Sequence, residues 1–199
     1  MKLMTSQNKI FHDGLTTMQL TLSSENEERL IAYLRLLQKW NKAYNLTAIT
    51  DFDKMISYHL LDSLSVAPYL TGNNIVDVGS GAGLPGIPLA IYFPEKKFTL
   101  IDSIGKKTRF ITQAVRELGL MNVTVLHSRA EKCQSKHCFD TMIARAVASI
   151  DDLINISKVL LNEEGKLLMM KSDEMVSDQY QVIKLSVPGI EAPRCLIVV

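Results

Sequence analysis

A stretch near the middle of the chain has residue types and spacing suited to ligand binding. The run 75–78, apolar except for Asp77, is followed by Gly79, Gly81 and Gly83, and then by Pro85 in the expected first turn of a helix. Glycines allow a tight turn and leave no Cβ between a ligand and the backbone, and a helix start presents free N–H groups. The stretch therefore predicts a loop that holds a nucleotide-like ligand.

Two templates fit this loop. Gly81-x-Gly83-x-x-Gly86 matches the fingerprint of dinucleotide-binding proteins, whereas Asp77-x-Gly79-x-Gly81-x-Gly83 matches the loop of Rossmann-like methyltransferases that bind S-adenosylmethionine. In the dinucleotide fingerprint the first glycine falls at the strand end, but here Gly79 rather than Gly81 takes that place. The register favours the methyltransferase template and makes Asp77 part of the predicted site.

Polar residues also follow the ends of later predicted strands, where ligands bind in parallel sheets. Asp102 closes the second strand, about 20 residues past the loop, where an acceptor for ribose hydroxyls is expected. Ala130 and Glu131 follow the third strand and can reach an adenine ring, and Arg145 ends the fourth. Taken singly, these residues could also be a helix cap, a solvated acid and a surface ion pair.

Basic residues gather beside the expected ligand site. Lys106, Lys107 and Arg109 lie just past Asp102, where they suit contacts with the phosphates of a nucleic acid. A charge run is more often only a solvated face. The whole chain adds no support, because 22 Lys and Arg residues stand against 21 Asp and Glu residues.

Composition limits the remaining classes. With 199 residues, of which 47% are hydrophobic, the chain can form one domain with a full core and a small appendage. Three cysteines are too few and too uneven for a disulfide framework, and no apolar run approaches the roughly 18 residues of a membrane span. We expect a cytoplasmic protein with no membrane partner and no obligate protein partner. No metal is expected, because metal-ligand spacing is lacking among His127, Cys133, His137 and Cys138.

Apolar periodicity predicts helices first and a sheet afterwards. A short helix within 1–22 precedes an amphipathic helix over 24–43, which begins at the capping box Ser24-x-x-Glu27, and a helix over 54–69. Five strands and three helices then alternate, which implies a parallel sheet. The strands are expected at 75–78, 97–101, 123–127, 141–144 and 166–170, and the helices at 85–93, 106–118 and 150–160.

The end of the chain differs, because the short Pro188-Gly189 turn region between the extended runs 180–187 and 195–199 allows only an antiparallel hairpin. The predicted fold class is therefore α/β, with a mostly parallel seven-stranded sheet, an antiparallel C-terminal strand and N-terminal helices. We expect an N-terminal helical extension at 1–72, packed on a Rossmann-like core at 73–199.

Five segments also carry a family resemblance. They are Trp40-Asn41-Lys42-Ala43-Tyr44-Asn45-Leu46-Thr47, His59-x-x-Asp62-Ser63, Asp77-Val78-Gly79-Ser80-Gly81-Ala82-Gly83-Leu84-Pro85-Gly86-Ile87-Pro88, Asp102-Ser103-x-Gly105-Lys106-Lys107 and Ala144-Arg145-Ala146. Together they closely resemble the bacterial 16S rRNA guanine-N7 methyltransferases, the GidB family, over about residues 20–199. The resemblance departs from the family pattern at Ser172 and Cys195, where glycine and histidine are expected.

The resemblance implies a class I methyltransferase that uses S-adenosyl-L-methionine to methylate N7 of one guanine in 16S rRNA, as free rRNA or in the 30S subunit. The family's cofactor contacts map onto Gly79, Leu84, Ala130, Glu131 and Arg145. We further expect Asp77 and the backbone of residues 79–83 at the methionine end and Asp102 at the ribose. RNA-side candidates are Asn45, His59, Lys106, Lys107, Arg109, Arg145, Lys171 and Arg194.

Two other functions remain open at this point. The first is an NAD-dependent oxidoreductase, which would need an acid or base beside the nicotinamide that the sequence does not identify. The second is a noncatalytic ribosome-assembly factor that uses the fold to bind rRNA. For methylation no catalytic residue is assigned, because guanine N7 has a lone pair and no proton, so that no general base is required.

Overall fold

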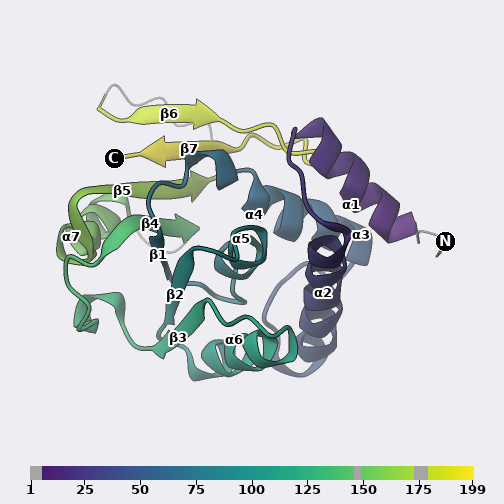
Figure 1. The fold of residues 1–199 in the computed structure, drawn as a ribbon, viewed down its shortest axis with the longest axis horizontal. Helices are drawn as coiled ribbons and strands as arrows, with labels where there is room; N and C mark the ends of the chain where they lie inside the picture. Colours follow the sequence, from purple (N-terminus) through teal and green to yellow (C-terminus); the bar gives the residue numbers. More distant parts are fainter. Residues whose placement is uncertain (1–5, 146–148, 173–178) are drawn as a thin grey trace.

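Seven strands form the sheet of the computed structural model, which describes residues 6–145, 149–172 and 179–199. The strands are β1 (Asn74–Val78), β2 (Lys97–Asp102), β3 (Val123–His127), β4 (Phe139–Arg145), β5 (Leu161–Lys171), β6 (Gln181–Lys184) and β7 (Cys195–Val198). Their order is β3-β2-β1-β4-β5-β7-β6 (Figure 1). Neighbours from β3 to β5 are parallel, and β7 is antiparallel to both β5 and β6. The predicted fold class, including the antiparallel C-terminal strand, is confirmed.

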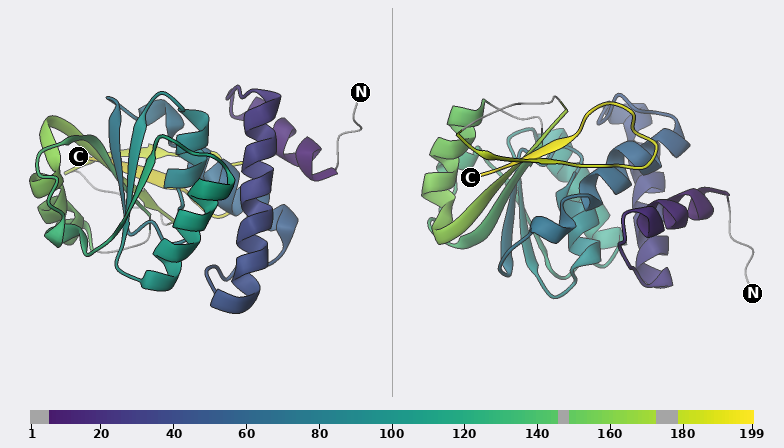
Figure 2. Two further views of the ribbon diagram at one scale, coloured as in Figure 1. Left: turned by 60° about the horizontal axis from the view of Figure 1, so that its bottom comes forward. Right: turned by 90° about the horizontal axis from the view of Figure 1, so that it is seen from above.

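Helices cover both faces of the sheet, as Figure 2 shows. On one face lies α7 (Ile150–Leu160), and on the other lie α5 (Gly86–Tyr92) and α6 (Gly105–Glu117), with α2 (Ser24–Tyr44) outside them. Alternate residues of a strand point to opposite faces. Ile75 of β1 accordingly packs in the core on the α5 side, and Val76 and Val78 pack in the core on the α7 side.

The N-terminal helices share the core of the sheet. Phe11 of α1 (Ser6–Thr17) and Leu34 of α2 belong to the same buried cluster as Leu100 of β2. The side chain of Ser23 caps α2 by accepting a hydrogen bond from Asn26 N at 3.2 Å. The predicted cap at Ser24 is therefore wrong by one residue, because Ser24 already has helical geometry. None of the described helices is long and apolar enough to cross a membrane.

The segment predicted as one helix over 54–69 consists of four pieces. They are α3 (Phe52–Met55), the π-helical η1 (Ile56–Leu61), α4 (Asp62–Leu64) and the 3₁₀ helix η2 (Ala67–Tyr69). Apolar periodicity locates a helical segment, but it does not distinguish α-helical from π-helical hydrogen bonding. The predicted helical stretch is confirmed, but its π-helical part was not predicted, and this part matters because π-helical turns occur frequently at functional sites.

Other predicted boundaries need only small changes. The strand expected at 166–170 begins earlier, at Leu161, which pairs with Phe139 of β4. The polar residues that follow Leu161 lack the apolar pattern from which a strand is predicted. A 3₁₀ helix, η3 (Ala130–Lys132), follows β3. Ala146 of the predicted Ala144-Arg145-Ala146 segment and residues 1–5 of the first predicted helical region lie outside the described residues.

Candidate functional site

The glycine loop between β1 and α5 is fastened to the end of β2. Gly79 N and Ser80 N donate hydrogen bonds to Ile101 O at 2.8 and 3.1 Å. Gly79 and Gly81 have φ angles of 69° and 61°, which side chains with a Cβ rarely adopt. The glycine spacing therefore turns the chain at the strand end and leaves the loop backbone facing open space.

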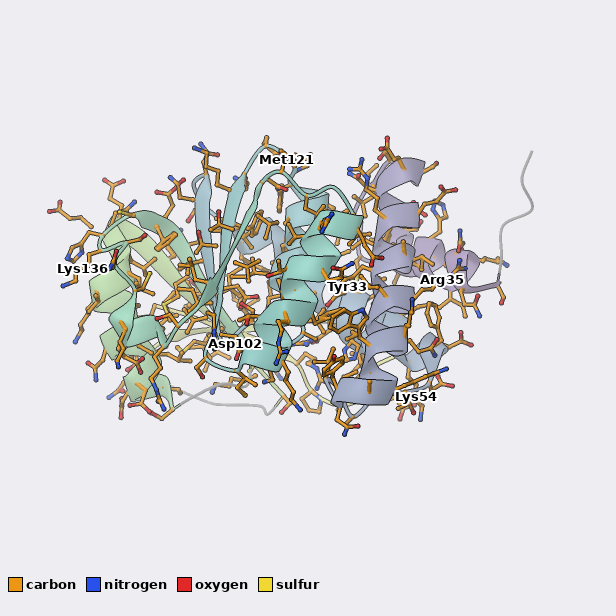
Figure 3. The ribbon with its side chains drawn as sticks, turned by 90° about the horizontal axis from the view of Figure 1, so that it is seen from below. Tyr33, Arg35, Lys54, Asp102, Met121 and Lys136 are labelled. Atoms are coloured by element: carbon orange, nitrogen blue, oxygen red, sulfur yellow. The ribbon has the colours of Figure 1, made fainter. Side chains whose placement is uncertain are left out.

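Asp102 joins the loop to the start of α6. Its Oδ2 accepts a hydrogen bond from Gly81 N at 2.8 Å, and its Oδ1 accepts one from Ile104 N at 2.8 Å. Lys107 Nζ lies 3.9 Å from Oδ2. Figure 3 shows Asp102 at one end of the β2–α6 unit and Met121 at the other. A carboxylate oxygen can accept a second hydrogen bond, so the buried Asp102 can both hold the loop and bind hydroxyls.

A cavity of about 570 Å³ lies at the carboxyl ends of β1 to β4, and we call it the first cavity. Most of the predicted cofactor residues line it, and so do three of the RNA candidates, His59, Lys107 and Arg145. The cofactor residues on its wall are Gly79, Gly81, Leu84, Asp102, Ala130, Glu131 and Arg145. The structure thus brings together residues that are widely separated in the sequence.

The lining of the first cavity fits S-adenosylmethionine. The volume falls within the roughly 300–1,000 Å³ that is usual for small-molecule sites. Ile101, Ala130 and Leu153 supply an apolar wall for a purine ring, and Asp102 supplies acceptors for ribose hydroxyls. A Cβ on Gly81 would meet only Gly79 O, at 3.9 Å, so the space beside the loop is open. These residues can hold a nucleoside with a polar tail.

Asp77 and Gly83 lie behind the loop and not on the cavity wall. Because side chains alternate along β1, Asp77 points toward α5, where its Oδ2 accepts a hydrogen bond from Gly86 N at 2.9 Å. A Cβ on Gly83 would lie 2.6 Å from Ile87 Cγ1, so this glycine also faces α5. Burial raises the pKa of Asp77 from 3.8 to about 7, opposed by the Gly86 hydrogen bond and by Arg145. Asp77 and Gly83, both predicted to bind the cofactor, therefore support the loop from behind and do not line the cavity.

The turn after α2 forms a further part of the wall that the sequence did not assign. Asn41 Oδ1 accepts hydrogen bonds from Leu46 N and Thr47 N at 2.6 and 2.8 Å, and Asn41 Nδ2 donates to Thr47 O at 2.9 Å. Thr47 Oγ1 lies 2.9 Å from His59 Nε2. Leu46, Thr47 and His59 line the first cavity. The signal was Asn41, since a buried asparagine near a helix end often bonds the following turn.

Asp62 joins two arginines at the other side of the site. Its Oδ2 accepts a hydrogen bond from Arg145 Nη1 at 3.0 Å, and its Oδ1 accepts one from Arg194 Nε at 3.1 Å. Arg145 Nη1 also donates to Tyr58 O at 3.2 Å, and the Arg194 guanidinium lies 5.8 Å from the Tyr58 ring centroid. The role of Asp62 could not be read from spacing, because its partners lie 83 and 132 residues away.

The remaining RNA candidates are spread more widely. Asn45 is the exposed, left-handed C-cap of α2, and Lys106 Nζ donates a hydrogen bond to Tyr44 O at 2.7 Å. Arg109 lines a separate groove between α6 and β3. Lys171 and Arg194 line another cavity, of about 430 Å³, which we call the second cavity. Asn45, Lys106 and Arg109 thus lie off both cavities, and their contact with RNA stays a prediction.

The cysteine and histidine residues that were discounted as metal ligands form no metal-binding cluster in the described part of the chain. No group of three or more His, Cys, Asp or Glu side chains there is arranged to hold a metal ion. Cys133 and Cys195 are buried free thiols, and Cys138 is an exposed one.

Solved methyltransferase structures share this fold. A SAM-dependent methyltransferase from Aquifex aeolicus matches with a TM-score of 0.58 and 17% identity, covering 80% of this chain and 95% of that one. M. jannaschii TYW2 in complex with AdoMet matches with a TM-score of 0.57 and 16% identity, covering 69% of this chain and 72% of that one. At these identities the likeness concerns the fold alone.

Sequence comparisons are more specific. Ribosomal RNA small subunit methyltransferase G of Marinomonas sp. (strain MWYL1) is 50% identical over 194 residues, 93% of each chain. The protein of that name from Pseudomonas aeruginosa (strain LESB58) is 46% identical over 195 residues, 93% of this chain and 91% of the relative. The family described as GidB, rRNA small subunit methyltransferase G, matches residues 26–193. This chain therefore belongs to the rRNA small subunit methyltransferase G family.

Proposed function

We propose that this protein transfers the methyl group of S-adenosylmethionine to N7 of one guanine in 16S rRNA. The observation that carries the proposal is the first cavity, in which a glycine loop, Asp102 and Ala130 surround a space suited to this cofactor. Family membership supports rRNA as the substrate class. The choice of guanine N7 rests on the resemblance of the five segments to the 16S rRNA guanine-N7 methyltransferases.

The reaction asks for alignment more than for acid or base catalysis. When bound, S-adenosylmethionine supplies a methyl group on a cationic sulfur, and the N7 lone pair forms the new N–C bond while the C–S electrons pass to sulfur. The protein must bring guanine N7, the methyl carbon and the sulfur into line and exclude water, which is a task of proximity and orientation. The glycine loop, fixed by Ile101 O and Asp102, can hold one reactant in place.

The charge near the reacting atoms also matters, because the positive charge moves from sulfur to the methylated base. His59 lines both cavities, and burial lowers its pKa from 6.5 to about 4, assisted by the nearby Arg145. This histidine is therefore neutral at neutral pH and adds no repulsion to the developing cation. Asp62 offsets the charge of Arg145 in the same region.

Family membership argues against an NAD-dependent oxidoreductase, and the experiment separates methylation from noncatalytic rRNA binding. Purified protein and labelled S-adenosylmethionine are mixed with 30S subunits, or with free 16S rRNA, from cells that lack the gene. Chemical cleavage at N7-methylguanine, followed by primer extension, should give one new stop. Methylation at another atom or in another RNA would contradict the proposal, and rRNA binding without transfer would favour an assembly factor. A protein that modifies ribosomal RNA would act in the cytoplasm.

A further inference from the structure

The second cavity adjoins the first one and has a different lining. His59 and Arg145 belong to the walls of both cavities, so they stand between the cofactor space and the neighbouring space. Its lining mixes apolar and aromatic residues with polar and charged ones, and Lys171, Ser172 and Cys195 are among them. Its further lining includes Ile49, Tyr58, Asp62, Met170, Leu185 and Arg194.

The π-helical η1 brings its residues to this cavity. Tyr58 and His59 both come from η1, and Asp62 follows directly after it. His59 is 5% exposed, and its Nδ1 atom has no hydrogen-bond partner among the described residues. A buried polar atom without a partner costs free energy, which a ligand with a suitable group can recover. His59 thus stands at the junction of the two cavities, with Nε2 hydrogen-bonded to Thr47 and Nδ1 buried without a partner.

The lining suits a flat aromatic ring better than a phosphate group. Protein recognition of single-stranded RNA relies on bases that leave the stack and lie against aromatic side chains or guanidinium planes. Tyr58 and Arg194 provide one group of each kind, 5.8 Å apart. Of the cations that line the cavity, Arg145 and Arg194 share the carboxylate of Asp62, which weakens their attraction for a phosphate, and Lys171 lines the cavity as well.

Asp62 also bears on which edge of a guanine remains free. An arginine that reads guanine usually binds its O6 and N7 atoms together, and this contact would block N7 as a nucleophile. Asp62 instead engages Nη1 of Arg145 and Nε of Arg194. The arginines are thereby held by a protein carboxylate, and N7 can stay available to the methyl group.

We propose that the second cavity binds the target guanine after it has left the RNA stack, with Tyr58 as the stacking surface and His59 at the junction with the cofactor. The proposal rests on the proposed function, because the base must meet a methyl donor in the first cavity. It assigns a binding role to Tyr58 that the sequence did not predict. Enzymes that modify a base inside a structured nucleic acid usually extrude it into such a pocket.

The test compares Tyr58→Ala and Tyr58→Phe with the wild-type protein on 30S subunits. Loss of a base stack should lower kcat/KM for methyl transfer by about 5- to 150-fold in Tyr58→Ala, and the ring of Tyr58→Phe should restore it. The affinity for S-adenosylmethionine, measured by calorimetry without RNA, should stay the same. Tyr69→Ala is the matched control, because Tyr69 is equally half-buried and lines a different cavity.

A second variant guards against a purely structural effect of removing the Tyr58 ring. Ile49→Trp adds volume at the wall of the second cavity, and it should abolish transfer while the cofactor affinity is kept. Normal kcat/KM in both Tyr58→Ala and Ile49→Trp would overturn the assignment, and so would an equal loss of cofactor affinity in both. Absence of transfer by the wild-type protein would instead overturn the proposed function itself.

Discussion

Two sides of the site are built in different ways. The donor side, made by the loop 79–84, Asp102 and Ala130, is held by backbone N–H groups that donate hydrogen bonds to Ile101 O and to the Asp102 carboxylate at the end of β2. The acceptor side, made by Tyr58, His59, Asp62, Arg145 and Arg194, is held by contacts between side chains from η1, α4, β4 and the segment before β7. One side therefore depends on backbone conformation, and the other on a network of charges.

This difference predicts two kinds of failure. Substitutions on the donor side should weaken binding of the cofactor, because the backbone groups that surround it move. Damage to the acceptor side should slow transfer to RNA while the cofactor still binds, because the first cavity keeps its wall of loop, Asp102 and Ala130. Calorimetry with S-adenosylmethionine and kinetics with 30S subunits separate these outcomes.

The largest effect is expected from Gly81→Asp on the donor side. The substitution puts a carboxylate on a cavity-lining residue whose N–H binds Asp102, at a φ of 61°. Like-charge repulsion and the strained backbone should weaken cofactor binding at least about 100-fold, or roughly 2.7 kcal/mol. Gly119→Asp is the control, since Gly119 has a φ of 65° and open space around its Cβ, far from the cavity. Unchanged affinity in Gly81→Asp, measured by calorimetry, would break the assignment of the donor side.

The next effect concerns the acceptor side and the carboxylate that joins its arginines. Asp62→Ala leaves Arg145 and Arg194 without their shared partner. Freed guanidiniums can then take other contacts, and kcat/KM for transfer should fall at least about tenfold, or roughly 1.4 kcal/mol. The cofactor affinity should change by less than about threefold, or roughly 0.65 kcal/mol. Asp53→Ala, at an exposed position of α3, serves as the control. If Asp62→Ala mainly lost cofactor affinity, the distinction between the two sides would not hold.

The same difference explains how much of the site could be predicted from sequence. On the donor side the function lies in a local pattern, because the glycine register, the strand end and Asp102 follow each other within one βαβ unit. Such a pattern carries both the fold and the ligand class. The antiparallel end of the sheet was equally readable, because a short turn around Gly189 leaves no room for a crossover.

On the acceptor side the information is not local. The partners of Asp62 are distant in the chain, and only tertiary packing brings them together. The sequence motif also did not show where the Asp77 side chain points. The motif includes Asp77, but the alternation along β1 turns its side chain away from the cavity. The π-helical form of η1 was also hidden, since its apolar pattern matches that of an α-helix. Pattern thus predicts which segments matter, and packing decides which atoms face the ligand.

Asp77 provides a test of the support behind the loop. Its pKa is about 7 in the folded protein and 3.8 ordinarily, so folding favours the protonated carboxyl. Its contribution to stability is complete below about pH 4 and is lost as the pH rises through 7, by a few kcal/mol in order of magnitude. Urea unfolding of wild type and Asp77→Asn between pH 4.5 and 7.5 should show the wild type losing stability relative to the variant. Parallel pH profiles would mean that Asp77 titrates normally.

The smallest expected effect comes from a single hydroxyl that ties the N-terminal helices to the donor side. Tyr33 of α2 is fully buried, and its hydroxyl donates a hydrogen bond to Ala82 O of the loop at 2.6 Å. Tyr33→Phe leaves that carbonyl without its partner, which should cost about 1–3 kcal/mol of unfolding free energy. Cofactor affinity should fall only about two- to fivefold, or roughly 0.4–1 kcal/mol, because the bonds to Ile101 O and Asp102 still hold the loop. Tyr44→Phe, at a partly exposed ring, is the control. If Tyr33→Phe weakened cofactor binding as strongly as Gly81→Asp, the loop would depend on the N-terminal helices rather than on the sheet. The donor side could then not be described as a local structure.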